Sequence, residues 1–224
     1  MKTYRHKFSL AVIIFSLFSF SVTAQTFKTK DYYQLKNGSE WRYTAPPNWK
    51  EGDYVSRIVE DEKENIFRHF DATKAAKLLS LKKKGIYYTG EEFAGGDSVA
   101  KFDSPILWFP AKLKIGDRIE EQREFTRIFR DGKTVRGTFK ITQIISRLED
   151  VKNSAGDFVN CLRVESETFW DLGDGRKARS INIYHYAKKV GVVKASARFI
   201  IINAEGKETV NRLIETDLKS YKIQ

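Results

Sequence analysis

The chain has 224 residues, of which 41% are hydrophobic and 13% aromatic. This composition excludes a disordered or fibrous protein, and the length is that of one domain or at most two small ones. The formal net charge is +11, which favours interaction with anionic partners. Cys161 is the single cysteine, so an internal disulfide is excluded and packing must stabilise the fold. We expect Cys161 to be a small apolar residue in a strand, the alternative being a disulfide between chains.

The first 24 residues have the pattern of a secretory signal peptide. A basic start is followed by an uncharged apolar run from Phe8 to Val22 and by small residues before Gln25. We expect cleavage after Ala24, which leaves residues 25–224 as one exported domain, periplasmic or extracellular. An uncleaved anchor is the alternative, but the run is shorter than the ~20 apolar residues that a membrane span requires.

Alternation of apolar and polar residues predicts strands over most of the mature chain. The clearest case is residues 134–147, in which Val135, Phe139, Ile141 and Ile145 alternate with polar residues, as in a strand with one face on a core. Similar enrichment in β-branched and aromatic residues predicts strands at residues 54–60, 65–70, 85–90, 118–129, 158–170, 180–186, 192–203 and 208–223.

Short links rich in Gly, Asn and Asp separate these strands, which favours antiparallel hairpins. We therefore predict a mainly β fold: a single curved antiparallel sheet, as a meander, half-barrel or open barrel, with at most one or two short helices. Residues 71–84 fit a helix or a strand equally well. Residues 98–114 contain Pro105 and Pro110 and an apolar stretch, and we expect this segment to cover the apolar face of the sheet.

Four blocks of the sequence, at residues 32–43, 107–120, 156–166 and 183–196, resemble a loose group of secreted bacterial proteins of unknown function. The positions that carry the resemblance are Tyr33, Leu35, Gly38, Trp41, Tyr43, Pro105, Gly116, Asp117, Cys161, Tyr186, Ala187, Gly191 and Lys194. The resemblance implies a half-barrel similar to periplasmic lipoprotein carriers and brings no catalytic residues. The last block departs from the group's pattern at Lys188, Lys189 and Val190, which puts the geometry of that turn in question.

The sequence lacks the spacing of known catalytic, metal or cofactor motifs, so we expect neither an enzyme nor a bound cofactor or metal. His69 and His185 stand alone in strand-like context. His185 shares its predicted face with Ile181 and Ile183, so we expect a satisfied, partly buried imidazole that lies apart from Cys161. A hydrolase with an unrecognised site remains an alternative, and it would need His69 or His185 beside an Asp or Glu.

Basic residues gather near the predicted turns. The four groups are Lys82–Lys84, then Arg127, Arg130, Lys133 and Arg136, then Arg176, Lys177 and Arg179, and finally Lys188, Lys189 and Lys194. Nucleic acid is a poor partner for an exported protein, which leaves a solvated basic face or contact with anionic lipid.

We expect a non-enzymatic binding protein whose concave face takes a lipid or another apolar ligand. The residues expected to line that groove are Trp108, Phe109, Tyr184 and Tyr186. The alternative is an envelope structural or interaction protein whose basic loops contact anionic lipid or lipopolysaccharide.

Overall fold

The computed structural model describes residues 25–45, 52–71, 74–93 and 96–224. The predicted signal peptide, residues 1–24, lies outside the described residues. Within the described ranges, no helix has both the length and the apolar character needed to cross a bilayer.

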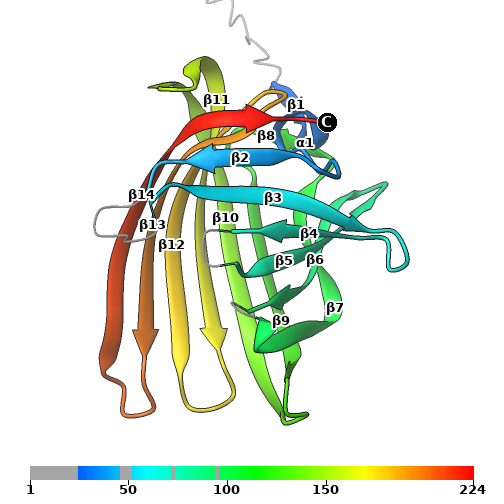
Figure 1. The fold of residues 1–224 in the computed structure, drawn as a ribbon, viewed down its shortest axis with the longest axis vertical. Coiled ribbons are helices and arrows are strands. Elements are labelled where there is room, and N and C mark those ends of the chain that lie inside the picture. The colour runs from blue at the N-terminus through cyan, green and yellow to red at the C-terminus, as the bar shows by residue number, and fades with distance from the viewer. Residues whose placement is uncertain (1–24, 46–51, 72–73, 94–95) are drawn as a thin grey trace, which may run out of the picture.

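Twelve antiparallel strands form a closed barrel (Figure 1). In barrel order they are β2 (Glu40–Tyr43), β3 (Tyr54–Asp61), β4 (Ile66–Phe70), β5 (Ala76–Lys82), β6 (Gly85–Glu92), β7 (Ser98–Pro110), β9 (Arg118–Phe129), β10 (Thr134–Asn153), β11 (Gly156–Asp171), β12 (Lys177–Ala187), β13 (Gly191–Ile202) and β14 (Glu208–Lys222). The predicted mainly β meander is confirmed. The prediction of an open sheet was wrong, because β14 pairs with β2 and joins the two ends of the meander.

A short N-terminal unit lies at one end of the barrel, near the C-terminus (Figure 1). It consists of β1 (Thr26–Lys28), α1 (Thr29–Tyr32) and β8 (Lys112–Lys114), and β1 pairs with β8 in a separate two-stranded sheet. Phe27 and Leu113 are paired across this sheet, and both are buried in the core with Tyr32. We call β1, α1 and β8 the plug, because their buried side chains belong to the same hydrophobic cluster as the barrel.

Most of the segment expected to cover the sheet, residues 98–114, is instead part of the barrel wall as β7, and its last residues form β8 of the plug. β7 pairs with β6 along most of its length but with β9 only from Ser98 to Phe102. Pro105 lies where β7 has a partner on neither side, at the irregularity in its pairing with β6, and Pro110 pairs with β6 but has no partner in β9. A strand tolerates proline at such positions. Residues 71–84, for which helix and strand were both open, contain strand β5.

Alternation along β10 places Phe139, Ile141 and Ile145 inside the barrel, each no more than 1% exposed. Directly opposed residues of antiparallel strands point to the same side of a sheet, so the register extends this assignment to neighbouring strands. Ile145 pairs with Val164, and Val164 pairs with Tyr184, which puts Tyr184 inside. Ile183 accordingly faces outward and is only partly buried.

The turn between β12 and β13 contacts both the plug and β2. The backbone N–H of Lys189 donates to the carbonyl of Asp31 in α1 at 2.5 Å, and the indole N–H of Trp41 donates to the carbonyl of Val190 at 2.6 Å. Gly191 has a φ of +104°, and a Cβ there would lie 3.3 Å from the indole nitrogen. The hairpin therefore forms although Lys188, Lys189 and Val190 depart from the pattern of the resembling group. Lys189 adopts a positive φ of +63° in this turn.

Replacement of Ile145 by alanine should lower the free energy of unfolding by about 2–5 kcal/mol, because the side chain is fully buried. Ile181→Ala is the matched control: Ile181 is 39% exposed on the outer face, and its truncation should cost about 0.5 kcal/mol or less. Chemical denaturation of both variants measures the difference. Equal losses would contradict the assignment of inner and outer faces.

Candidate functional site

One side of the barrel interior is filled by aromatic rings. Phe139 lies 4.4 Å from Trp170 between ring centroids, and Tyr88 lies 4.9 Å from both Phe102 and Trp108. Edge-to-face and tilted contacts at these separations are typical of a packed aromatic core. This side of the barrel is therefore solid.

The opposite side carries smaller residues. Ala195 and Ala197 of β13 pair with the inner-facing Tyr184 and Asn182 of β12, so both alanines point inward. Both are nevertheless partly exposed, whereas the aromatic rings opposite are mostly buried. The inner face of β13 is thus partly accessible to solvent, and we call the barrel interior that it faces the lumen.

His69 is held on the inner face by two hydroxyl groups. The Ser56 hydroxyl lies 2.8 Å from the carbonyl of Phe70 and 2.9 Å from Nε2 of His69, while the Tyr33 hydroxyl lies 2.7 Å from Nδ1. Ser56 has one proton, and because it donates that proton to Phe70 it must accept from Nε2–H. Tyr33 then donates to Nδ1. Burial, with a smaller effect from Lys77, lowers the pKa of His69 to about 3, so the imidazole stays neutral.

Charged residues continue this inner row. Register pairs His69 with Lys77, and Lys77 with Glu91, across β4, β5 and β6. Burial raises the pKa of Glu91, and the Tyr88 hydroxyl donates a short hydrogen bond to its carboxylate. For Lys77 burial acts against the charge, but Glu91 and then Tyr184 and Asp71 raise its pKa above the ordinary value. We call His69, Lys77 and Glu91 the charged row.

The four residues expected to line a groove have different environments. Trp108, Phe109 and Tyr186 are buried in the hydrophobic core, where Phe109 and Tyr186 contact Tyr33 beneath the plug. Tyr184 is partly exposed on the inner face. Burial raises its pKa, and the influence of Lys77, Asp71 and Glu91 on that pKa places it within electrostatic reach of the charged row.

A small cavity lies between the plug and the charged row. Its volume is about 20 Å³, and its lining includes Tyr33, Trp41, His69 and Tyr186. A cavity of this size holds about one water molecule. The barrel interior next to the plug is therefore packed tightly, and this cavity is too small for an organic ligand.

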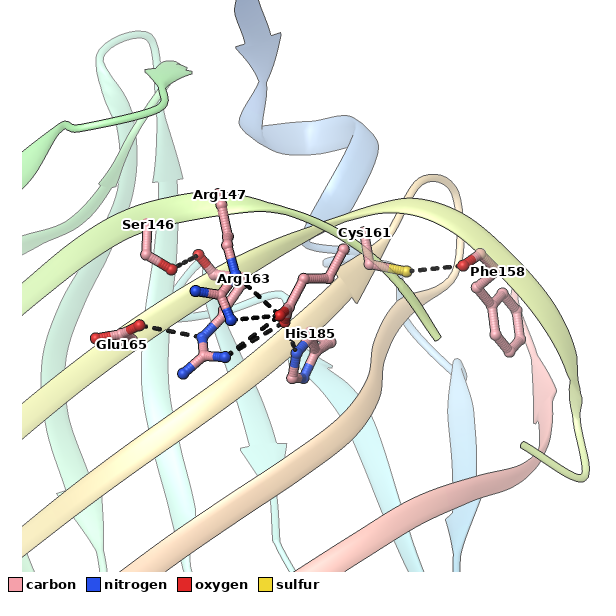
Figure 2. Close-up of polar contacts among 8 residues, drawn as sticks. Ser146, Arg147, Phe158, Cys161, Arg163, Glu165 and His185 are labelled. Atoms are coloured by element: carbon pink, nitrogen blue, oxygen red, sulfur yellow. Dashed lines mark hydrogen bonds and ion pairs between the residues drawn. The ribbon is translucent and has the colours of Figure 1, made fainter. Parts of the chain in front are cut away.

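A second polar cluster lies on the outer face. Figure 2 shows Arg147, Arg163 and His185 converging from β10, β11 and β12. His185 Nε2 lies 2.6 Å from the Glu149 carboxylate, which also contacts Arg147 at 2.5 Å and Arg163 at 3.4 Å. A pocket of about 350 Å³ adjoins these side chains. The expectation of a satisfied imidazole holds for Nε2 only: Nδ1 is buried without a hydrogen-bond partner in the described part of the chain.

His185 also has charged neighbours on the adjacent strands. Its register partners are Arg163 and Lys194, although it does share the outer face of β12 with Ile181 and Ile183. Hydrogen bonds from Arg147 and then His185 lower the pKa of Glu149 to about 2. The cluster is therefore a carboxylate and imidazole pair fixed by two guanidinium groups.

Cys161 is fully buried. Its thiol lies 3.6 Å from the carbonyl of Phe158, also drawn in Figure 2, and burial, followed by the charge of Asp150, raises its pKa to about 11. A thiol in this state is a poor nucleophile. Among the described residues, no three His, Cys, Asp or Glu side chains are grouped so as to hold a metal.

Comparison with known proteins gives limited information. No family model and no curated protein matches the chain. One similar solved structure is that of a Bacteroides fragilis protein predicted to be exported, with a YmcC-like fold: identity is 13%, the TM-score 0.44, and the match covers 85% of this chain and 98% of the other. Another is a protein of Parabacteroides distasonis predicted to be a lipoprotein, with 10% identity, a TM-score of 0.40, and coverage of 85% and 97%.

Sequence reasoning missed the charged row. Lys77 and Glu91 occur in segments whose pattern was ambiguous or short, and only the register of β4, β5 and β6 brings them together with His69. The available signal was Lys77, a charged residue at the same phase as the apolar Ala75 and Leu79 on either side of it; for Glu91 there was none, because the irregularity after Tyr88 shifts the phase of β6. A single sequence does not distinguish such a residue from one on the outer face.

The nitrogen-bound protons of His69 provide a test of the inner hydrogen-bond chain. Nitrogen-detected NMR should show a neutral ring protonated at Nε2 from pH 7 to about pH 4, because the folded-state pKa is about 3. Since the unfolded chain binds this proton near its ordinary pKa of about 6.5, His69 should reduce stability as the pH falls from about 6.5 to 3. Titration of the His69 signal near pH 6.5, assigned by its loss in His69→Asn, would contradict this arrangement.

Glu149→Gln should destabilise the protein at neutral pH by about 1 kcal/mol, a modest value because partly exposed ion pairs are screened. The folded-state pKa of Glu149 is lowered to about 2, so its contribution is present above about pH 4.5 and is lost as the pH falls to 2. Denaturation of both proteins across this range should show converging curves. Glu215→Gln, which alters an exposed carboxylate of β14, serves as the control, and a Glu149 difference that persists at pH 2 would refute the assignment.

Proposed function

We propose that this protein is a non-enzymatic binding protein of the bacterial envelope whose lumen takes an amphiphile with an acyl chain and an anionic head group. The observation that carries the proposal is the composition of the inner wall of the barrel. Small, partly exposed residues of β13 face a packed aromatic wall, and a lysine lies on the inner face of β5.

The apolar part of the ligand would lie along β13. Ala195 and Ala197 leave room that larger side chains would occupy, and Phe199 and Ile201 continue the same inner face toward the end of the barrel away from the plug. Burial of apolar surface stabilises a complex by about 25 cal/mol for each Å² removed from water. An extended chain placed here would contact apolar atoms along its length.

The head group would bind at Lys77. An ammonium group inside a barrel carries a desolvation cost that a carboxylate or phosphate can offset, and the hydroxyl of Tyr184 lies within electrostatic reach of it. Glu91 partly compensates Lys77 in the free protein. Its raised pKa allows it to accept a proton when a second anion arrives.

Absence of catalysis is part of the proposal. The Ser56 hydroxyl donates to a carbonyl, so His69 does not act on it as a base. His185 has a carboxylate neighbour, as the hydrolase alternative required, but the nearby thiol of Cys161 is buried and protonated. Location in the envelope is supported by the signal-peptide pattern of residues 1–24.

Calorimetric titration with laurate and with lauryl alcohol tests the site. Lys77→Met should weaken laurate binding by about tenfold, equivalent to about 1.4 kcal/mol, and leave the alcohol unchanged. Ala197→Leu should weaken both ligands by filling the lumen. The matched control is Arg198→Leu, on the adjacent outward position of the same strand, which should change neither.

Two outcomes would overturn the proposal. One is that the wild-type protein binds neither ligand. The other is that Lys77→Met and wild type bind laurate equally, which would show that the charged row has no part in recognition.

A further inference from the structure

The excess positive charge of the chain is unevenly distributed. Three guanidinium groups from the basic clusters seen in the sequence are compensated in the fold: Arg136 pairs with Asp103 and Glu124, Arg176 with Asp174, and Arg179 with Glu167. Arg127 is buried, its guanidinium 4.2 Å from the ring centroid of Phe93 and 4.6 Å from that of Phe129. These groups offer little free charge to a partner.

The outer layer of the plug is made of lysines. Lys28 pairs in register with Lys112, and Lys114 lies two pairs along the same ladder, opposite Thr26. Because Phe27 and Leu113 point into the core, alternation directs these three lysines outward, and all are exposed. Lys30 of α1 is exposed beside them.

Two turns add further lysines to the same surface. The β5–β6 turn carries Lys83 and Lys84, and the Lys84 carbonyl accepts from the N–H of Ala111, next to Lys112. The β12–β13 turn carries Lys188 and Lys189 and is joined to α1 through the carbonyl of Asp31. We call this set the lysine rim: Lys28, Lys30, Lys83, Lys84, Lys112, Lys114, Lys188 and Lys189.

No ion pair joins a lysine of the rim to any residue of the described ranges. Of the acids nearby, Asp117 has its carboxylate engaged by the backbone N–H of Lys114 at 2.7 Å. Exposed apolar side chains accompany the rim: Leu81 is 50% exposed just before the β5–β6 turn, and Ile115 is 42% exposed just after β8. The surface therefore combines uncompensated cations with protruding apolar groups.

A depression of about 600 Å³ lies beside the plug. It is lined by Phe27, Tyr32, Val159 and Lys188 among others, and Val159 is 69% exposed. Its lining combines apolar side chains with polar ones, including Lys188 and Asp157. This end of the molecule is thus suited to a surface that is both anionic and apolar beneath its charges.

We propose that the plug end of the barrel binds the surface of a bilayer that contains anionic lipids. Clustered lysines are attracted to the negative surface potential of such a bilayer, and exposed aliphatic side chains enter its interfacial region. The lysine stems cover apolar surface while their ammonium groups contact lipid phosphates. This contact is independent of what the lumen holds.

Vesicle co-sedimentation of the full chain tests the proposal, with vesicles of phosphatidylcholine alone or mixed with phosphatidylglycerol. Binding to phosphatidylcholine alone provides the baseline for contributions that do not depend on charge. The basic residues of the first 24 positions, Lys2, Arg5 and Lys7, are common to the wild type and to the variants, so the comparison between proteins removes their contribution. The triple variant Lys28→Gln, Lys112→Gln, Lys188→Gln should lose the phosphatidylglycerol-dependent binding by about tenfold or more. High salt should weaken the wild-type binding in the same way.

The matched control is Lys133→Gln, Lys177→Gln, Lys207→Gln, which removes the same charge from exposed positions in or beside the turns of other hairpins. This control should bind as wild type does. Equal loss in both triple variants would show that net charge alone is responsible and would overturn the proposal. So would wild-type binding that phosphatidylglycerol does not increase. Unchanged thermal unfolding of both variants establishes that they are folded.

Discussion

The pairing of β2 with β14 is the constraint on which the rest of the structure depends. It joins the first and last strands of the meander, and the side chains of β2 strengthen it: Trp41 donates to Val190, and the Tyr43 hydroxyl donates to the carbonyl of Val192 at 2.9 Å. Once the sheet is closed, β4, β5 and β6 face β12 and β13 across the interior. The charged row and the small residues of β13 then line one space, and both sides of the proposed lumen follow from this closure.

The strands of the second half were predictable from sequence because alternation in β9 to β14 extends over many residues and Gly-containing turns separate them. Closure of the barrel was not predictable, because it depends on the pairing of β2 with β14, which lie near opposite ends of the chain. β5 was ambiguous since Leu78 and Leu79 are adjacent and both buried, so the segment shows no clear apolar and polar alternation. Pro105 indicated a covering segment, but a strand with a ladder on one side also tolerates proline. The turn at Lys188–Val190 departs from the expected pattern without loss of the hairpin.

The candidate site was less predictable than the fold. Tyr184 was singled out for its strand, and it does lie on the inner face, but Trp108, Phe109 and Tyr186 are core residues whose aromatic character fits packing as well as binding. Only the cross-strand register shows that Lys77 and Glu91 are neighbours on the inner face. His185 and Arg163 are neighbours for the same reason, so a pattern read along one strand could not place a carboxylate beside the imidazole. In the proposed arrangement the two ends of the barrel differ: lysines surround the plug, and the lumen lies on the other side of it.

The central claim is that the barrel encloses a lumen made for an amphiphile. An experimental electron-density map of the protein, purified from its own envelope without detergent, tests this claim most directly. The account predicts elongated density along Ala195 and Ala197 that ends near the ammonium group of Lys77. A lumen closed by inward side chains, or one that contains only ordered water around Lys77 and Glu91, would contradict it.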